Sequence, residues 1–383
     1  MSRRGAERVR GGHVWIYRSD VVTADGVPPG SAVLVKQQGS KALLGTAFYS
    51  TASQIAVRML SREALENIGN VLRQRVRAAV EYRKRLVRDT NAYRVIFSES
   101  DSLPGLIVDC YNDLLSMQVL NQAMDSETSR TAILSELQEI LKPKAIIERS
   151  DARVRKLEQL PEKQSGLVAG EQTRTEFQMN GVRFIYDALS GQKTGAFLDQ
   201  RENYAAAEQY ARGEALDVFC YQGGFALHLA RCCERVTGVD SSLSALEAAE
   251  ANSKLNGREI EWIEANAFDL LRDYSDSGRQ YDSIVLDPPA FAKTREKRDT
   301  ALRGYKELNL RALKMLRPGG VLMTCSCSFH VSGNDLLEAL GSAAGDAGRP
   351  VRVLELRGQA KDHPQVLGIP ETAYLKCIIS IVR

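Results

Sequence analysis

Residues 214–240 read EALDVFCYQGGFALHLARCCERVTGVD, and this stretch decides the fold. An apolar run ends at Phe219, a Gly-Gly pair opens an apolar helical segment, and a second apolar run ends at Asp240. Strand, helix and strand in this order form the crossover that joins neighbouring parallel strands. The stretch therefore predicts a parallel sheet covered by helices on both faces.

The same alternation continues toward the C-terminus. Further strand candidates occupy residues 260–266, 281–287, 319–327, 351–356 and 375–383. A loop rather than a helix joins the last two, so we expect them to pair antiparallel. The region from about Gly213 thus predicts an α/β fold with a seven-stranded, Rossmann-like sheet.

The N-terminal half has a different pattern. Short β-type runs separated by turn residues predict a small β-barrel or sandwich, at residues 14–17, 31–37, 42–50 and 54–60. A helix is expected from Ser61, capped by Ser-Arg-Glu-Ala, to about Arg88. Residues 93–186 read as an α+β module that ends in a hairpin turning at Asn180-Gly181, and residues 156–171 read as a loop. We expect three domains: 1–72, 73–187 and 188–383.

Composition excludes several classes of protein. The seven cysteines lack paired C-x-x-C spacing, and the four histidines are not spaced as ligands, so we expect no disulfide framework and no metal. No run of about 18 apolar residues and no signal peptide is apparent, which predicts a cytoplasmic protein that does not bind membranes. The net charge of +3 neither requires nor excludes a polyanionic partner.

Ligands of open α/β sheets bind beyond the carboxyl ends of the strands, so the residues there are candidates. Gly223 and Gly224 would let a ligand approach the backbone closely, although a Gly-Gly turn is more often simple packing. Asp240, at the end of the next strand, suits ribose hydroxyls. Asn266 suits the edge of an adenine ring, or is equally well a turn residue.

The fourth strand ends in LDPPAF, residues 286–291. Two prolines fix the backbone and remove two N–H donors, so that Asp287 and the preceding carbonyls can meet a planar base. Phe291 offers a ring on which a base can stack. A rigid turn with a capping Asp is the alternative, and substrate contact by Asp287, Pro288, Pro289 and Phe291 is favoured over it.

The fifth strand ends in TCSC, residues 324–327. A thiol at this edge suits covalent catalysis at carbon 5 of a pyrimidine, a carbon that becomes nucleophilic after a thiolate adds at carbon 6. Alternation places Cys325 and Cys327 on one face, and Cys327 is closer to the edge, which makes it the chosen nucleophile. Two small buried residues would be the structural alternative.

A polar segment precedes the first strand of this region, in LSGQKTGAFLDQRENY, residues 189–204. Its side chains can cover a ligand at the sheet edge. Asp199 and Arg201 could instead form a surface ion pair that caps a helix.

Together these motifs resemble those of a known family. GQKTGAFLDQR, DVFCYQGGF, VTGVDSS, LDPPAF and TCSCS, in this order, are similar to the bacterial 23S ribosomal RNA large subunit methyltransferase I family, which makes 5-methylcytosine. The N-terminal GGHVWIYRSDV and STASQIAVRML look like its RNA-binding PUA domain. The resemblance covers nearly the whole chain. It implies a PUA-like domain, a central α+β domain and a class I S-adenosylmethionine-dependent methyltransferase domain, with ribosomal RNA as the partner.

The resemblance also implies roles for individual residues. Cys327 would be the nucleophile, and Asp287 would face both the methyl group and the base. The residues expected to bind S-adenosylmethionine are Lys193, Thr194, Phe197, Asp199, Gln200, Arg201, Phe219, Tyr221, Gly223, Gly224, Asp240, Ser241, Asn266, Ala267, Phe268 and Asp287.

Two positions depart from the family pattern. Asn266 stands where such enzymes usually have Asp, and Ala290 stands where many 5-methylcytosine RNA enzymes have a product-releasing Cys. The group that removes the carbon 5 proton is therefore open, with Asp287 as the candidate.

Three other functions stay open at this point. Methylation of a guanine or adenine amine would also use Asp-Pro-Pro and needs no cysteine. An RNA-binding protein that has lost catalysis is the second. Methylation of a small molecule is the third, and it leaves half the chain unexplained. The sequence determines neither the target nucleotide and the assembly stage of the RNA nor the oligomeric state, for which a homodimer is one option.

Overall fold

The computed structural model describes residues 1–40, 42–188, 195–292 and 294–383, which form two compact units. Unit 1 comprises Met1–Phe177, Tyr186–Gly195 and Lys361–Thr372. Unit 2 comprises Gln178–Ile185, Ala196–Ala360 and Ala373–Arg383. The division into three domains at residues 72 and 187 stays a prediction.

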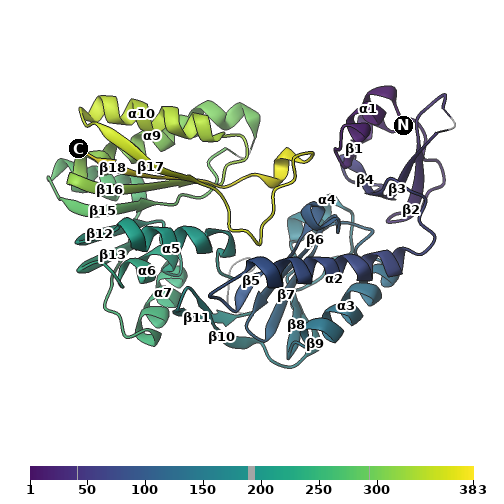
Figure 1. Ribbon diagram of the computed structural model, residues 1–383, viewed down its shortest axis with the longest axis horizontal. Coiled ribbons are helices and arrows are strands. Elements are labelled where there is room, and N and C mark those ends of the chain that lie inside the picture. Colours follow the sequence, from purple (N-terminus) through teal and green to yellow (C-terminus); the bar gives the residue numbers. More distant parts are fainter. Residues whose placement is uncertain (41, 189–194, 293) are drawn as a thin grey trace. The chain divides into compact units, whose positions relative to one another are not determined.

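Unit 2 is built on the predicted seven-stranded sheet (Figure 1). Its strands are β12 (Glu214–Val218), β13 (Arg235–Asp240), β14 (Glu261–Glu264), β15 (Tyr281–Leu286), β16 (Leu316–Ser326), β17 (Val351–Arg357) and β18 (Lys376–Val382). Their order is β14-β13-β12-β15-β16-β18-β17. The first five are parallel and β18 pairs antiparallel with both β16 and β17, so the expected fold class and closing hairpin are confirmed.

Helices cover both faces of this sheet (Figure 1). They are α5 (Arg201–Tyr210), α6 (Gly224–Leu229), α7 (Leu243–Leu255), α8 (Ala267–Asp276), α9 (Arg298–Met315) and α10 (Gly333–Ala347). Helices α8, α9 and α10 share one core with the strands, in which Leu271, Leu308 and Leu336 pack with Leu216 and Leu286. This continuous burial keeps the strand ends of the parallel sheet in fixed positions.

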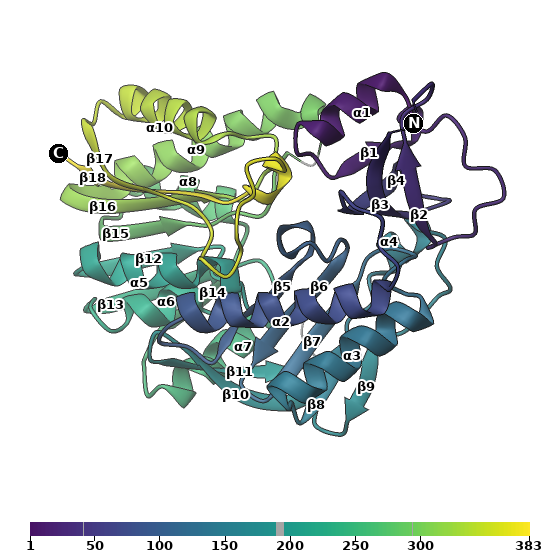
Figure 2. The same cartoon turned by 45° about the vertical axis from the view of Figure 1, so that its right-hand side comes forward.

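Unit 1 contains two sheets. The four-stranded antiparallel sheet β1-β4-β3-β2 consists of β1 (Trp15–Tyr17), β2 (Ala32–Lys36), β3 (Leu43–Tyr49) and β4 (Ile55–Ser61). The five-stranded sheet consists of β5 (Ala92–Phe97), β6 (Leu106–Tyr111), β7 (Leu114–Val119), β8 (Ala145–Glu148) and β9 (Gly166–Gly170). Helices α2 (Ile68–Leu86) and α3 (Glu127–Leu141) lie next to each other and pack on the second sheet (Figure 2).

The remaining elements are short. They are α1 (Arg3–Arg10), α4 (Ala152–Leu157), the 3-10 helices η1 (Arg18–Asp20), η2 (Ser98–Asp101), η3 (Leu198–Gln200), η4 (Arg295–Lys297) and η5 (Pro370–Thr372), and the hairpin strands β10 (Arg174–Met179) and β11 (Val182–Asp187). The hairpin turns at Asn180 and Gly181, whose φ angles of 51° and 80° are the left-handed pair that this turn requires.

Two expectations in unit 1 were wrong. Helix α2 begins at Ile68 rather than Ser61, because Ser61 still belongs to β4 and the Asn67 side chain caps the helix by accepting a bond from the Asn70 amide. The predicted loop 156–171 contains β9, which pairs with β8 at the edge of the sheet. A short glycine-bounded strand at an edge carries too weak a pattern to be recognised from sequence.

Among the residues that the structure describes, no helix has both the length and the apolar character needed to cross a bilayer.

Candidate active site

The site lies where the strand order reverses, at the carboxyl ends of β12 and β15. Asp287 directly follows β15, and its amide donates to the Val218 carbonyl of β12 at 3.2 Å. After β12 the chain turns sharply, with positive φ at two residues that are not glycine, Phe219 (68°) and Tyr221 (51°). Such conformations cost about 1–3 kcal/mol each and are found mainly at functional sites.

Asp240 at the end of β13 holds this turn. Its carboxylate accepts from the amides of Tyr221 and Ser242, each at 2.9 Å. Each carboxylate oxygen keeps a second acceptor position, which leaves Asp240 able to bind hydroxyl groups. Ser241 is exposed beside it.

The two glycines have separate structural reasons. Gly223 has φ 86°, and a Cβ on Gly224 would lie 2.5 Å from the Tyr204 ring. The buried Asp217 carboxylate accepts from the Ala226 amide at 2.8 Å and so replaces the missing cap of α6. Backbone conformation and packing therefore account for both glycines without a ligand.

Asn266 is the N-cap of α8. Its side-chain oxygen accepts from the amides of Phe268 at 2.9 Å and Asp269 at 3.4 Å. This geometry favours the turn-residue interpretation for that oxygen, while the side-chain NH₂ group stays available. Ala267 is buried in the first turn, and the Phe268 ring lies 5.9 Å from that of Phe291.

Asp287 is linked to the segment that precedes α5. Gln200, which is buried, donates from Nε2 to Asp287 Oδ1 at 2.9 Å. Asp199 accepts from the Tyr374 hydroxyl at 2.6 Å. Burial first, and then repulsion from Asp199, raise the pKa of Asp287 to about 7, although the bond from Gln200 opposes the shift.

Two aromatic rings close the space above the turn. Phe197 and Tyr221 contact edge to face with ring centroids 5.0 Å apart, and Phe197 is 43% exposed. The cavity beneath, lined also by Phe219, Gly224 and Asp287, has about 10 Å³. A nucleoside-sized ligand needs several hundred Å³, so this cavity is too small for one in the arrangement observed.

The structure gives less information on the other candidate residues of the segment 189–204. Arg201 is buried at the start of α5, 3.7 Å from Glu202, rather than on the surface. Lys193 and Thr194 lie outside the described residues.

The residues that follow Asp287, namely Pro288, Pro289 and Phe291, differ in exposure and contacts. Pro288 is buried and its carbonyl lies 4.0 Å from Cys327 Sγ, whereas Pro289 is exposed. The Phe291 ring packs against Tyr305, with centroids 5.0 Å apart, and against Gly304. Much of that ring is thus used for packing.

The structure separates the two cysteines. Cys325 is fully buried and lies opposite Cys377 in the antiparallel register of β16 and β18, with both thiols free. Cys327 follows the last residue of β16 and is partly exposed. Burial raises the pKa of Cys327 to about 12, with further contributions from Asp287 and Asp199. Of these two thiols, only Cys327 is accessible to a substrate.

Sequence reasoning missed two residues around this thiol. Tyr305 of α9 exchanges hydrogen bonds with Ser326 at 2.9 Å and Ser328 at 3.1 Å, on either side of Cys327. Lys376, the first residue of β18, donates to the Ser328 carbonyl at 2.7 Å. Both belong to elements distant in sequence, and no local pattern marks them.

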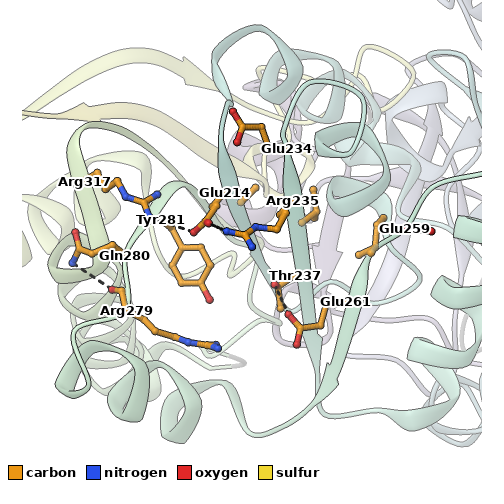
Figure 3. Close-up of a pocket in the computed structure, with 13 residues that line it drawn as sticks. Glu214, Glu234, Arg235, Thr237, Glu259, Glu261, Arg279, Gln280, Tyr281 and Arg317 are labelled. Carbon is orange, nitrogen blue, oxygen red and sulfur yellow. Dashed lines mark hydrogen bonds and ion pairs between the residues drawn. The ribbon is translucent and has the colours of Figure 1, made fainter.

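A second depression lies at the opposite edge of the sheet (Figure 3). It has about 690 Å³ and is lined by the first residues of β12, β13, β14 and β15. Glu214 there lies between Arg235 and Arg317 (Figure 3). Arg317 also pairs with Asp282. Because ligands of such sheets bind at the carboxyl ends, we assign these ion pairs to the structure of the sheet. No group of three or more potential metal ligands occurs among the described residues.

Comparisons with known families match both halves of the chain. A model described as S-adenosylmethionine-dependent methyltransferase matches residues 120–376, and a model described as PUA-like domain matches residues 1–62.

Curated relatives cover nearly the full length. The ribosomal RNA large subunit methyltransferase I of Aeromonas hydrophila is 38% identical over 97% of this chain and 96% of its own. That of Klebsiella pneumoniae strain 342 is 38% identical over 95% and 93%.

Solved structures share the fold. A methyltransferase crystallised with SAH has a TM-score of 0.84 at 18% identity, covering 99% of this chain and 98% of that one. A SAM-dependent methyltransferase from Streptococcus mutans has a TM-score of 0.82, also at 18% identity and with the same coverage.

Proposed function

Because the chain belongs to the ribosomal RNA large subunit methyltransferase I family and is an S-adenosylmethionine-dependent RNA methyltransferase, we propose that it methylates carbon 5 of a cytosine in 23S ribosomal RNA through a covalent adduct on Cys327. One observation carries the proposal: Cys327 is the accessible thiol of the pair, and its Sγ lies 4.0 Å from the Pro288 carbonyl, one residue after Asp287.

The charges at the strand ends suit S-adenosylmethionine. Asp199 and Asp287 are close enough for Asp199 to raise the pKa of Asp287, and a cation between them would relieve this repulsion. The cofactor carries two cationic groups, a sulfonium and an ammonium, and supplies an electrophilic methyl group when bound. We assign Phe197, Tyr221 and Gly224 to its methionine part and Asp240 to its ribose.

The remaining candidate residues are assigned to other parts of the cofactor site. Asp199, Gln200 and Arg201 support the cofactor from the segment before α5, together with Lys193 and Thr194 by family resemblance. Ser241, Asn266, Ala267 and Phe268 line the nucleoside side. Phe219 and Gly223 shape the turn.

The proposed reaction uses two side chains. The Cys327 thiolate adds to carbon 6 of the ring, and the electron pair of the 5,6 double bond makes carbon 5 nucleophilic. After carbon 5 is methylated, its proton leaves, the electron pair restores the double bond and the thiolate is expelled. Asp287, with a pKa raised to about 7, can bind the polar edge of the base and accept this proton near neutral pH.

RNA is the partner of this protein. We propose that the exposed Arg3, Arg4 and Arg10 of α1 contact phosphates, since they lie within the PUA-like part of the chain. Pro288, Pro289 and Phe291 would contact the flipped base. A cytoplasmic location and a homodimer stay predictions, the latter tested by the mass measured in light scattering.

The deciding experiment replaces each cysteine of the pair. Cys327→Ala should lower tritium transfer from labelled S-adenosylmethionine to RNA on the order of 10³-fold or more, because the covalent step is lost. RNA containing 5-fluorocytosine should form a stable adduct with the wild type, since fluorine cannot leave as a proton does, and none with Cys327→Ala.

Cys325→Ala is the matched control, which should keep both activities. If Cys327→Ala retained methylation, the covalent mechanism would be rejected.

One observation favours a second candidate. The raised pKa of Cys327 leaves the thiol protonated at neutral pH unless another group stabilises the thiolate. Methylation of an exocyclic amine held by Asp287 would need no thiolate, and it would survive Cys327→Ala.

A further inference from the structure

Cys327 needs a counter-charge if it is to act as a thiolate. Its surroundings are unfavourable, since burial, Asp287 and Asp199 all disfavour the anion. The neighbouring Tyr305 hydroxyl is engaged by Ser326 and Ser328. Compensation must therefore come from another element.

Lys376 lies at the required place. It is the first residue of β18, in register with Ser326 of β16, the residue before Cys327. Its Nζ donates to the carbonyls of Ser328 and Tyr374, each at 2.7 Å, so the ammonium is anchored next to Cys327. An ammonium has three N–H donors, and a third can point toward the thiolate.

The ammonium is not neutralised by a carboxylate. Within the described ranges, no Asp or Glu oxygen lies within ion-pair distance of Lys376, and Asp335 of α10 acts on it only as a more distant charge. Partial burial of an ammonium without a carboxylate partner costs free energy, and a thiolate nearby would offset part of that cost.

We propose that Lys376 stabilises the thiolate form of Cys327, and is thus a positioning residue of the methylation proposed above. Its charge lowers the pKa of Cys327, while the charge of a Cys327 thiolate raises the pKa of Lys376 in return. Burial lowers the pKa of Lys376 to about 8, so the stabilising cation is present below that pH and is lost above it.

Among the described residues, the other charged or titratable groups that act on the pair come from four elements. They are Asp287 after β15, Asp199 of η3, Asp335 of α10 and Tyr305 of α9, with Cys325 and Cys377 buried beneath. None of them is a cation. An effect of removing Lys376 on the thiol can thus be assigned to its charge.

The test measures the thiol without RNA. The full-length protein is alkylated with iodoacetamide from pH 6 to 10, and fragment-ion mass spectrometry follows Cys327 separately from Cys325. At pH 7, where the wild-type lysine carries its charge, Lys376→Met should slow the alkylation of Cys327 about tenfold, and the difference should shrink above pH 8. Lys376→Arg, which keeps the cation, should restore most of the rate.

Lys314→Met is the matched control, because Lys314 is an exposed lysine at the end of α9 in the same unit. It should alkylate like the wild type. A thermal melt identifies variants that fail to fold, and Lys376→Gln, which keeps a polar donor for both carbonyls, replaces Lys376→Met in that case. A profile of the folded neutral variant that overlays the wild type overturns the proposal.

Single-turnover methylation gives a second measurement. The deficit of Lys376→Met should be largest near pH 7 and should shrink above pH 8, where the wild type also loses its cation; a purely structural role would give a deficit independent of pH. The alkylation difference between the wild type and Lys376→Met does not depend on RNA chemistry. If Cys327→Ala kept methylation while Lys376→Met still slowed alkylation of Cys327, the covalent function would fail and the Lys376–Cys327 coupling would stand.

Discussion

At the scale of single residues, Asp287 is a carboxyl group whose pKa is raised to about 7, near neutral pH. Its neighbours are Gln200, a neutral donor, and Asp199, a like charge. Among the described residues, no cation forms a hydrogen bond or ion pair with Asp287, and burial is the largest cause of its raised pKa. A carboxyl of this kind can exchange a proton at the pH of the cell, which an ordinary surface Asp cannot.

Asp287→Asn should change how stability depends on pH. The folded protein holds the Asp287 proton up to about pH 7, and the unfolded chain releases it near pH 4. The wild type therefore loses stability as pH rises through this window, whereas the variant does not. Relative to wild type, the free energy of unfolding of Asp287→Asn should increase by about 1–2 kcal/mol between pH 5 and pH 8, after allowance for solvent screening.

Urea denaturation at the two pH values measures this difference. Asp273→Asn, a substitution of an exposed carboxylate on α8, is the control and should show no such trend. An Asp287→Asn variant whose difference from wild type is the same at both pH values would show that the carboxyl is ionised in the folded state throughout. Methylation by this variant should fall about 10²-fold or more, since its polar contact with the base and its proton acceptor are both altered.

Residue types at strand ends were predictable from sequence, but their contacts were not. The pattern TCSC identified two candidate thiols, and a position closer to the sheet edge favoured Cys327, which the structure leaves partly exposed. Lys376 could not be found in this way. Its position beside Cys327 depends on the pairing of β18 with β16, a contact between segments about 50 residues apart.

At the scale of elements, long periodic segments were predicted well. All seven strands of unit 2 occur within a few residues of their expected positions. Helix α1, the start of α2 and strand β9 were not predicted. In each case a short or polar segment takes its structure from a cap or an edge pairing rather than from a repeating apolar pattern.

Asn67→Ala tests the observed start of α2. The Asn67 side chain satisfies the Asn70 amide at 2.9 Å, and its loss should lower the free energy of unfolding by about 1 kcal/mol. Glu66→Ala, a neighbouring exposed residue before the helix, should change it by less than about 0.5 kcal/mol. Equal effects of the two substitutions, measured by urea denaturation, would contradict the assignment of the cap.

At the scale of the whole molecule, the chain does not finish one unit before it begins the next. The segment Lys361–Thr372, between β17 and β18, belongs to unit 1 although both strands belong to unit 2. Within unit 1, buried Arg83 of α2 pairs with Asp101 and donates to the carbonyls of Arg94 at 2.9 Å and Asp362 at 2.8 Å. The Asp362 carboxylate in turn accepts from the Arg94 amide at 2.8 Å.

Arg83→Met should therefore destabilise unit 1 strongly. The substitution leaves the Asp101 carboxylate and the carbonyls of Arg94 and Asp362 without their cationic donor, at a cost of about 3 kcal/mol. Hydrogen exchange should show faster exchange in both α2 and residues 361–372. Arg85→Met, an exposed change on the same helix, is the control, and a matching melting temperature for the two variants would argue against this role.

The sequence by itself determined the seven-stranded α/β fold and the polar residues at the strand ends, because these follow from apolar periodicity and from motifs of adjacent residues. It indicated the PUA-like and methyltransferase parts through the family resemblance that those motifs carry. Only the tertiary structure decided which thiol is accessible, which carboxylates repel each other and that Lys376 lies beside Cys327. The physical reason is that burial and electrostatic coupling depend on distances between segments remote in the chain, and strand pairing sets those distances.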